Sequence, residues 1–181
     1  MPIFGVTASS NMSTKLTDFY QIATTTVGST PVSEIVFSGI PSNYKHLQIR
    51  GISYSVVGAD CYVQFNGDTA NNYSHHQMRG SGGTPSSSAN ATAPGCWIGI
   101  DWSDNSQQIE SRVIDILDYA NTNKFKTTRT MHTSANNTST EWLEFTSGHW
   151  RSTSAITSIR IHASTQTFKQ YTSFALYGIT G

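Results

Sequence analysis

The chain has 181 residues, of which 36% are apolar and only 12% are charged, with 11 basic and 11 acidic side chains. This length suits one domain with a core of useful size. So low a charged fraction is frequent in secreted or virion β-proteins, whose surfaces are solvated by hydroxyls and amides. A balanced charge provides no field that would attract nucleic acid or an acidic membrane, so we expect neither partner. No apolar run approaches the roughly 20 residues of a membrane helix, and the N-terminus lacks the basic start and apolar block of a secretion signal.

Residues 1–17 are predicted to form an extended arm in front of a single domain that covers residues 18–181. The arm begins with apolar side chains that follow no helical or strand period, and residues 7–17 are small and polar. Such a segment cannot bury its apolar groups in a core of its own. Two interpretations stay open: a frayed terminus, or a tail in which Ile3, Phe4 and Val6 dock onto a neighbouring subunit.

An alternation of apolar and polar side chains begins at Asp18 and indicates strands from there on. Extended runs are expected at residues 18–27, 34–37, 44–57 and 60–65, separated by turn clusters such as 39–43. In the third run Leu47 and Ile49 share one face, but Ile52 has the opposite parity. Because a β-bulge produces a one-residue slip of this kind, a bulge or bend is predicted at Gly51.

The stretch from Phe65 to His76 organises the middle of the chain. Asn66-Gly67-Asp68 supplies turn chemistry, because Asn and Gly adopt positive φ at little steric cost. A strand is expected next, from Tyr73 to Arg79. Residues 80–94 are rich in Gly, Ser, Pro and Ala without any period, which predicts a low-complexity loop that is either mobile or held by a partner.

The second half of the chain continues the β pattern, with strands expected over residues 96–102, 109–119, 125–131, 141–150, 155–163 and 173–177. A helix over 109–119 is conceivable, but its β-branched residues and the run at 125–131 favour a strand pair. With about ten strands and no confident helix, the sequence predicts an all-β fold, a jelly-roll-like antiparallel β-sandwich.

Two cysteines, Cys61 and Cys96, lie in predicted strands. They could form one disulfide. The favoured interpretation is two small buried hydrophobes, because one pair alone is no disulfide framework.

Histidines and oxygen ligands invite a metal interpretation. His75 and His76 are adjacent and would point to opposite faces of a strand, so they cannot both bind one ion. Asp68 with Asn66 and Asn71 loosely resembles a calcium loop, but the bidentate Glu of such loops is missing, and capping of a turn is favoured. We therefore expect no metal and no other cofactor.

Pairs of carboxylates could mark an enzyme. Asp115 with Asp118, or Glu141 with Glu144, would suit glycoside hydrolysis if held roughly 5–9 Å apart, but nothing in the sequence brings them together. Neither a phosphate-binding loop nor a Gly-x-Ser-x-Gly elbow is present. The sequence therefore predicts a protein without catalytic residues.

Tryptophans are the strongest remaining cue for ligand binding. Trp97 and Trp102, together with residues 80–94, could bind a carbohydrate or a receptor, because exposed aromatic faces stack on sugar rings. The favoured alternative is that these aromatics fill the sandwich core or a subunit interface.

Several stretches together resemble a recurring type of tailed-bacteriophage virion protein. They are Ile35-Val36-Phe37-Ser38-Gly39-Ile40-Pro41-Ser42-Asn43-Tyr44-Lys45-His46-Leu47-Gln48-Ile49-Arg50, Phe65-Asn66-Gly67-Asp68 with Asn72-Tyr73-Ser74, Asp118-Tyr119-Ala120-Asn121-Thr122-Asn123-Lys124-Phe125-Lys126-Thr127, Ala155-Ile156-Thr157-Ser158-Ile159-Arg160-Ile161 and Leu176-Tyr177-Gly178-Ile179. Similar domains occur in phage capsid decoration (cement) proteins and in tail or head fibres, usually as jelly-roll-like sandwiches. The resemblance runs from about Glu34 to the C-terminus, and its motifs are structural rather than catalytic.

This resemblance implies a structural protein of the virion, assembled in the host cytoplasm. A capsid decoration protein is favoured over a fibre, because no long shaft accompanies the domain. It would stabilise the shell by binding the major capsid protein or other virion proteins as a homo-oligomer, expected to be a trimer. The alternative is a receptor- or carbohydrate-binding module of a tail or head fibre or a baseplate.

Overall fold

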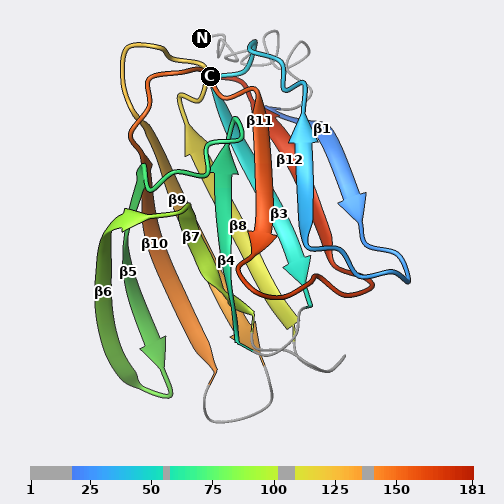
Figure 1. The fold of residues 1–181 in the computed structure, drawn as a ribbon, viewed down its shortest axis with the longest axis vertical. Coiled ribbons are helices and arrows are strands. Elements are labelled where there is room, and N and C mark those ends of the chain that lie inside the picture. Colours follow the sequence, from blue (N-terminus) through green and yellow to red (C-terminus); the bar gives the residue numbers. More distant parts are fainter. Residues whose placement is uncertain (1–17, 55–57, 102–108, 136–140) are drawn as a thin grey trace, which may run out of the picture.

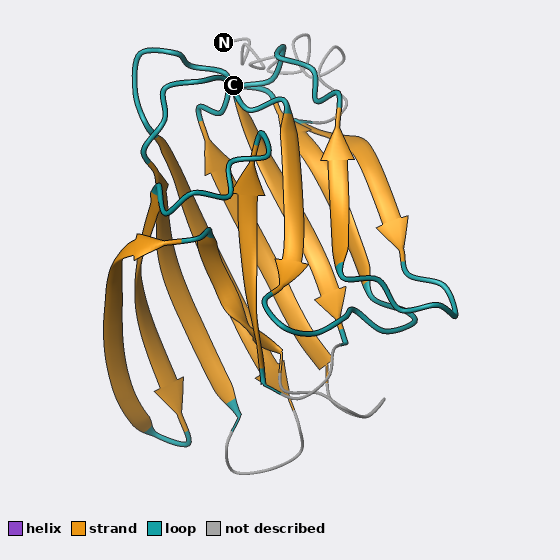
Figure 2. Cartoon of the chain, in the orientation of Figure 1, coloured by secondary structure: helices purple, strands orange, loops and turns teal. Residues whose placement is uncertain are grey.

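The computed structural model describes residues 18–54, 58–101, 109–135 and 141–181. This part of the chain consists of strands joined by loops and turns, without any helix (Figure 2), and so without one that could cross a membrane. The strands are β1 Phe19–Thr26, β2 Glu34–Ser38, β3 His46–Ser53, β4 Ala59–Phe65, β5 Tyr73–Ser81, β6 Thr84–Ala93, β7 Cys96–Asp101, β8 Ile109–Leu117, β9 Lys126–Ala135, β10 Trp142–Trp150, β11 Ser158–Ala163 and β12 Ser173–Ile179.

The strands form two antiparallel sheets that pack on each other as a sandwich (Figure 1). The large sheet has eight strands in the order β1-β12-β3-β8-β9-β10-β5-β6, and the small sheet has four in the order β2-β11-β4-β7. Apolar side chains from both inner faces fill the core between them, among them Ile49, Ile114 and Leu176 from the large sheet and Val63 and Ile161 from the small sheet. The predicted all-β sandwich is therefore confirmed.

Four strands of the large sheet, β9, β10, β5 and β6, lie side by side beyond β8, and we call them the extension. Figure 1 shows β5 and β6 as a curved hairpin at the far edge. Of the small sheet, β7 is the strand that contacts β9, β10 and β5. Along β6 every side chain except that of Ala93 is exposed. The inner face of the extension is thus covered chiefly by one strand.

The prediction of a loop over residues 80–94 is wrong. These residues complete β5 and form β6, which pair in register from Ser81 opposite Thr84 to His75 opposite Asn90. Gly82 and Gly83 make the turn between the two strands at positive φ (51° and 89°). The small polar side chains of β6 carry no apolar period, because neither of its faces is buried. Main-chain hydrogen bonds to β5 hold β6 in its extended conformation, and the pattern of side chains in the sequence does not reveal such bonds.

The predicted bulge at Gly51 is also wrong. β3 pairs with β8 and with β12 in unbroken register through this residue. The aromatic ring of Phe174 occupies the place that a Cβ at Gly51 would need, so glycine is required here by packing rather than by a bulge. Ile52 points outward and is 46% exposed, which explains why its parity differs from that of Ile49.

Other local predictions are confirmed. The turn after β4 has Asn66 and Gly67 at φ 53° and 70°, and Ile159 and Ile161 point into the core from β11. Residues 109–117 and 126–135 form the expected strand pair. Strand β9 continues beyond the expected run at 125–131, to Ala135.

Candidate functional site

In the extension, several buried side chains of the inner face are polar and several exposed side chains of the outer face are apolar, which is the reverse of the usual sandwich polarity. The buried polar residues on the inner face of β9 and β10 are Lys126, Thr128, Thr130, His132, Ser134, Glu144 and Thr146. In most sandwiches the inner face of each strand is apolar and the outer face polar. An inversion that covers several neighbouring strands therefore singles out this part of the molecule.

Apolar side chains gather on the outer face of the extension and of β8, and we call them the outer band. They are Met78, Val113, Met131, Leu143 and Phe145, and the last two and both methionines are between 44% and 63% exposed. Register aligns four of them in one row, with Met78 opposite Phe145, Phe145 opposite Met131 and Met131 opposite Val113. Residues far apart in the sequence thus form one continuous apolar strip across four strands.

All members of the outer band except Leu143 line a shallow groove of about 840 Å³. Its polar border includes His76, Ser147, Arg129 and Asp115, which form the next row across the same four strands. Contiguous exposed apolar surface with a polar border is typical of a protein-contact site. Methionine adds to this, because its unbranched thioether adapts to the shape of a partner.

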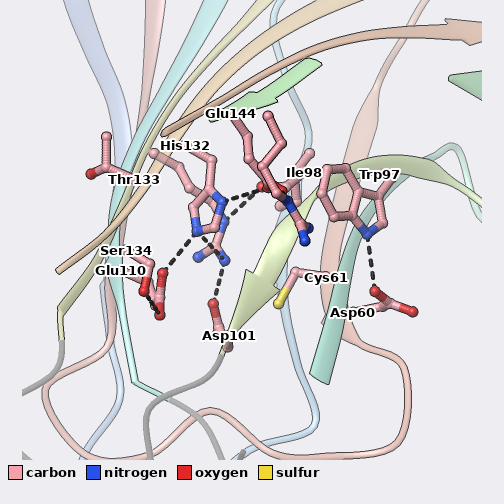
Figure 3. A network of polar contacts seen from close by, with 12 residues as sticks. Asp60, Cys61, Trp97, Ile98, Asp101, Glu110, His132, Thr133, Ser134 and Glu144 are labelled. Carbon is pink, nitrogen blue, oxygen red and sulfur yellow. Dashed lines mark hydrogen bonds and ion pairs between the residues drawn. The ribbon is translucent and has the colours of Figure 1, made fainter. Parts of the chain in front are cut away.

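Beneath the outer band, on the inner face of the same strands, lies a buried network of charges (Figure 3). The imidazole of His132 stands between two carboxylates, with Nδ1 3.0 Å from Glu144 Oε2 and Nε2 2.9 Å from Glu110 Oε2. Both carboxylates have further donors, since Arg79 binds Glu144 and the Ser134 hydroxyl donates to Glu110. A neutral imidazole has a single N–H, so both ring contacts are hydrogen bonds only if the ring or one carboxyl carries an extra proton.

Arg112 joins this network to the small sheet. Its Nε donates to the carbonyl of Ile98 on β7 at 2.8 Å, and its terminal nitrogens donate to Ser53 and Asp101. Burial lowers the pKa of the Arg112 guanidinium, but the surrounding acidic groups, Asp101 foremost, together raise it by more, so the pKa lies above its ordinary value. The buried guanidinium therefore stays charged and ties the two sheets together.

Three groups of metal-ligand type, on Asp101, Glu110 and His132, come close together in this network. Arg112 already supplies a cation there, because its Nη2 binds Asp101 and lies 3.4 Å from His132 Nε2. Both nitrogens of the His132 ring also face carboxylates. These groups thus contact one another or Arg112, apart from Asp101 Oδ2, which is buried without a hydrogen-bond partner.

Trp97 does not offer a face for sugar stacking, because only 4% of it is exposed. Its Nε1 donates to Asp60 Oδ1 at 3.1 Å (Figure 3), and its ring stacks on that of His75. The alternative in which the tryptophan fills the core is therefore confirmed at this position. Trp102, and the arm residues Ile3, Phe4 and Val6, lie outside the described residues.

The carboxylates that suggested an enzyme have separate partners. Asp115 is on the outer face and accepts a hydrogen bond from Gln48 Nε2 at 2.7 Å, whereas Asp118 follows β8 and pairs with Lys45 at 3.3 Å. Glu144 is buried in the charge network, and Glu141 is exposed just before β10.

Asp68 caps its turn, as the sequence favoured. Its carboxylate accepts hydrogen bonds from the Ala70 amide, the Asn72 amide group and the Trp150 indole at 3.0, 3.1 and 2.8 Å. Burial raises the pKa of Asp68, but these hydrogen bonds lower it by more, so the pKa is below its ordinary value. The carboxylate therefore joins the turn to the end of β10.

Both cysteines are free and buried, so the interpretation as small buried hydrophobes is confirmed. His75 is buried and His76 exposed, which confirms that they occupy opposite faces of β5. Sequence reasoning missed the outer band, because alternation assigns Phe145 to the core as readily as to the surface. The only sequence signal was the run Leu143-Glu144-Phe145, in which either parity is possible.

The fold and this surface define the class of the protein: an all-β sandwich with an apolar strip on the outer face of its large sheet. No family model, no curated protein and no solved structure matches the chain. Function must therefore be argued from the chain's own residues.

Proposed function

We propose that this chain is a structural protein of a phage virion that binds the capsid shell as a decoration protein and stabilises it. The observation that carries the proposal is the outer band, an exposed apolar strip of the kind that protein contacts cover. Membership in a virion rests on the sequence resemblance described above. Adhesion of this kind needs no cofactor and no catalytic group.

Strand order supports the resemblance. Without the extension, the large sheet reads β1-β12-β3-β8 and the small sheet β2-β11-β4-β7. Consecutive strands then alternate between two four-stranded sheets, except that β4 and β7 are neighbours in the small sheet. Two four-stranded sheets in this order are the arrangement of an eight-stranded jelly roll. We propose that the fold is a jelly roll into which the β5–β6 hairpin and the pair β9 and β10 are inserted. In this proposal the insertions carry most of the outer band.

Weak contacts suffice for a decoration protein, because the shell repeats them many times. Each copy that binds through more than one surface gains effective concentration from its first contact. The outer band would supply one contact, and the arm residues Ile3, Phe4 and Val6 would supply a second on a neighbouring subunit. The partners in this proposal are the major capsid protein, or another shell protein, and further copies of this chain.

The experiment that tests the function is quantitative mass spectrometry of purified virus particles from the source that encodes the chain. Hundreds of copies per particle are expected for a decoration protein. A few to a few dozen copies would instead assign it to a fibre or baseplate, and its absence from particles would refute virion membership. As a second measurement, protein without residues 1–17 should bind expanded capsids more weakly than the full chain, and equal binding would refute the role of the arm.

A further inference from the structure

We propose that two copies of this chain associate through the outer band around a two-fold axis that runs parallel to the strands, between β9 and β10. This inference rests on the proposed role of the outer band as a protein contact, and it names the occupant of the groove as a second copy. The argument depends on which residues the register places in each row of the large sheet. Three neighbouring rows matter: the apolar row and the row on each side of it.

In the apolar row the order across the strands is Val113, Met131, Phe145 and Met78, from β8 to β5. A two-fold axis in the plane of contact, between β9 and β10, exchanges the two halves of this row. Met131 of one copy then faces Phe145 of the other, and Val113 faces Met78. Every exposed apolar side chain of the row therefore meets an apolar side chain.

In the row on one side the order is Asp115, Arg129, Ser147 and His76. The same rotation places Asp115 of one copy over His76 of the other, and Arg129 over Ser147. A carboxylate thus meets a side chain that can donate a hydrogen bond and carry positive charge. The row on the other side is Ser111, Thr133, Leu143 and Gly80, which brings no charge into the contact.

Charge complementarity selects this axis over the other in-plane two-fold. A two-fold axis along the apolar row would also bring apolar side chains together, but each residue would then face the same residue of the other copy. It would place Asp115 over Ser111 and His76 over Gly80, so that neither ionisable group gains a partner. Buried charges without partners oppose association. Only the axis parallel to the strands satisfies the apolar row and at the same time pairs Asp115 with His76.

The contact is small. Four strands about 4.8 Å apart and five residues of about 3.4 Å each give a footprint of roughly 300 Å² per copy in projection. That is below the standard size of a stable interface, so we expect a weak dimer that forms at micromolar concentrations or above. Sheet twist rotates the two faces by about 30°, so the pairs nearest the axis, Met131 with Phe145, match most closely. A two-fold contact gives a dimer, and a trimer would need a different surface.

Sedimentation velocity of the full chain between about 1 and 500 µM tests the proposal. The wild-type protein should pass from monomer to dimer, and Phe145→Ser and Met131→Ser should weaken the dimer at least about 10-fold, because each removes an apolar group at the axis. Val36→Ser is the matched control, because Val36 is 50% exposed on the small sheet and should leave the dimer unchanged. A monomer throughout, a trimer, or a dimer that survives Phe145→Ser would overturn the proposal.

Charge exchange tests the axis itself. Asp115→Lys and His76→Glu should each weaken the dimer, and the double variant should restore it, because the two positions meet only between copies. Within one chain they lie three strands apart, at about 14 Å, too far for a direct ion pair. Failure of the double variant to restore the dimer would overturn the axis. If the protein is monomeric but is still found in particles, the proposed dimer is refuted and the proposed function is not.

Discussion

Gly99 of β7 lies directly against the imidazole of His132 on β9, so closely that a Cβ at Gly99 would overlap the ring. Gly99 also has φ +117°, a conformation that L side chains rarely adopt. The contact is the point where the small sheet covers the buried charge network. Glycine here lets the backbone of β7 lie flat on the ring that holds Glu110 and Glu144 together.

The first prediction concerns this contact. Gly99→Ala should lower the free energy of unfolding by about 2–4 kcal/mol, because backbone strain and overlap with the His132 ring add. Gly83→Ala is the matched control: it has φ +89° but no atom within 4 Å of the added Cβ, so it should lose only about 1 kcal/mol. Chemical denaturation of both variants measures the difference. If both variants lose the same free energy of unfolding, overlap with the His132 ring does not destabilise the protein.

The second prediction concerns the buried ion pairs. Glu144→Ala should destabilise the protein by about 3–5 kcal/mol, because it leaves Arg79 and His132 without their shared carboxylate in a buried site. The side chain of Glu144 is 0% exposed. For comparison, Glu34→Ala breaks the pair with Arg160, whose side chains are 42% and 32% exposed, and should cost less than about 1 kcal/mol. A similar loss in both variants, measured by denaturant unfolding, would contradict the prediction.

The third prediction concerns thiol chemistry. Burial raises the pKa of Cys96 to about 12, and burial with the neighbouring Asp101 carboxylate raises that of Cys61 well above its ordinary value. At pH 8 the reactive thiolate is therefore scarce as well as inaccessible. A coloured disulfide reagent should label neither cysteine in the native protein and both after unfolding in denaturant. An exposed control, Ser87→Cys on β6, should react at once, whereas prompt labelling of a native cysteine would refute the burial.

The fourth prediction concerns pH. Burial lowers the pKa of His75, an effect that the Asp60 carboxylate opposes and His76 reinforces. The unfolded chain therefore takes up a proton near pH 6.5 while the folded ring is still neutral, so this group's contribution makes stability fall as pH drops below about 6.5. His75→Phe keeps a ring against Trp97 but cannot titrate.

The free energies of unfolding of wild type and His75→Phe should accordingly run parallel above about pH 7.5. Below about pH 6.5 the wild type should lose stability more steeply than the variant, until the pH passes through the folded pKa. Denaturant unfolding at several pH values between 5 and 8 makes the comparison. Parallel curves throughout would show that His75 takes up its proton equally in the folded and unfolded states.

By itself, the sequence determined the fold class and most of the strands. Period-two alternation is a local property, so Val63 and Phe65 in β4, or Ile159 and Ile161 in β11, could be assigned to the core from their neighbours alone. Turn chemistry is equally local, and it placed the turn at Asn66 and Gly67. What the local pattern could not reveal was β6, because a strand with two exposed faces has no apolar period and is held by hydrogen bonds to a partner strand.

Only the tertiary structure decided which face of each strand is covered, and with it the candidate site. Alternation divides the side chains of β10 into two sets, but whether Glu144 or Phe145 lies inside depends on where β7 crosses the sheet. The outer band and the charge network both exist because register aligns residues from strands that are distant in the sequence. Register is fixed by pairing across the whole sheet, and a one-residue change would turn every side chain of a strand to the opposite face.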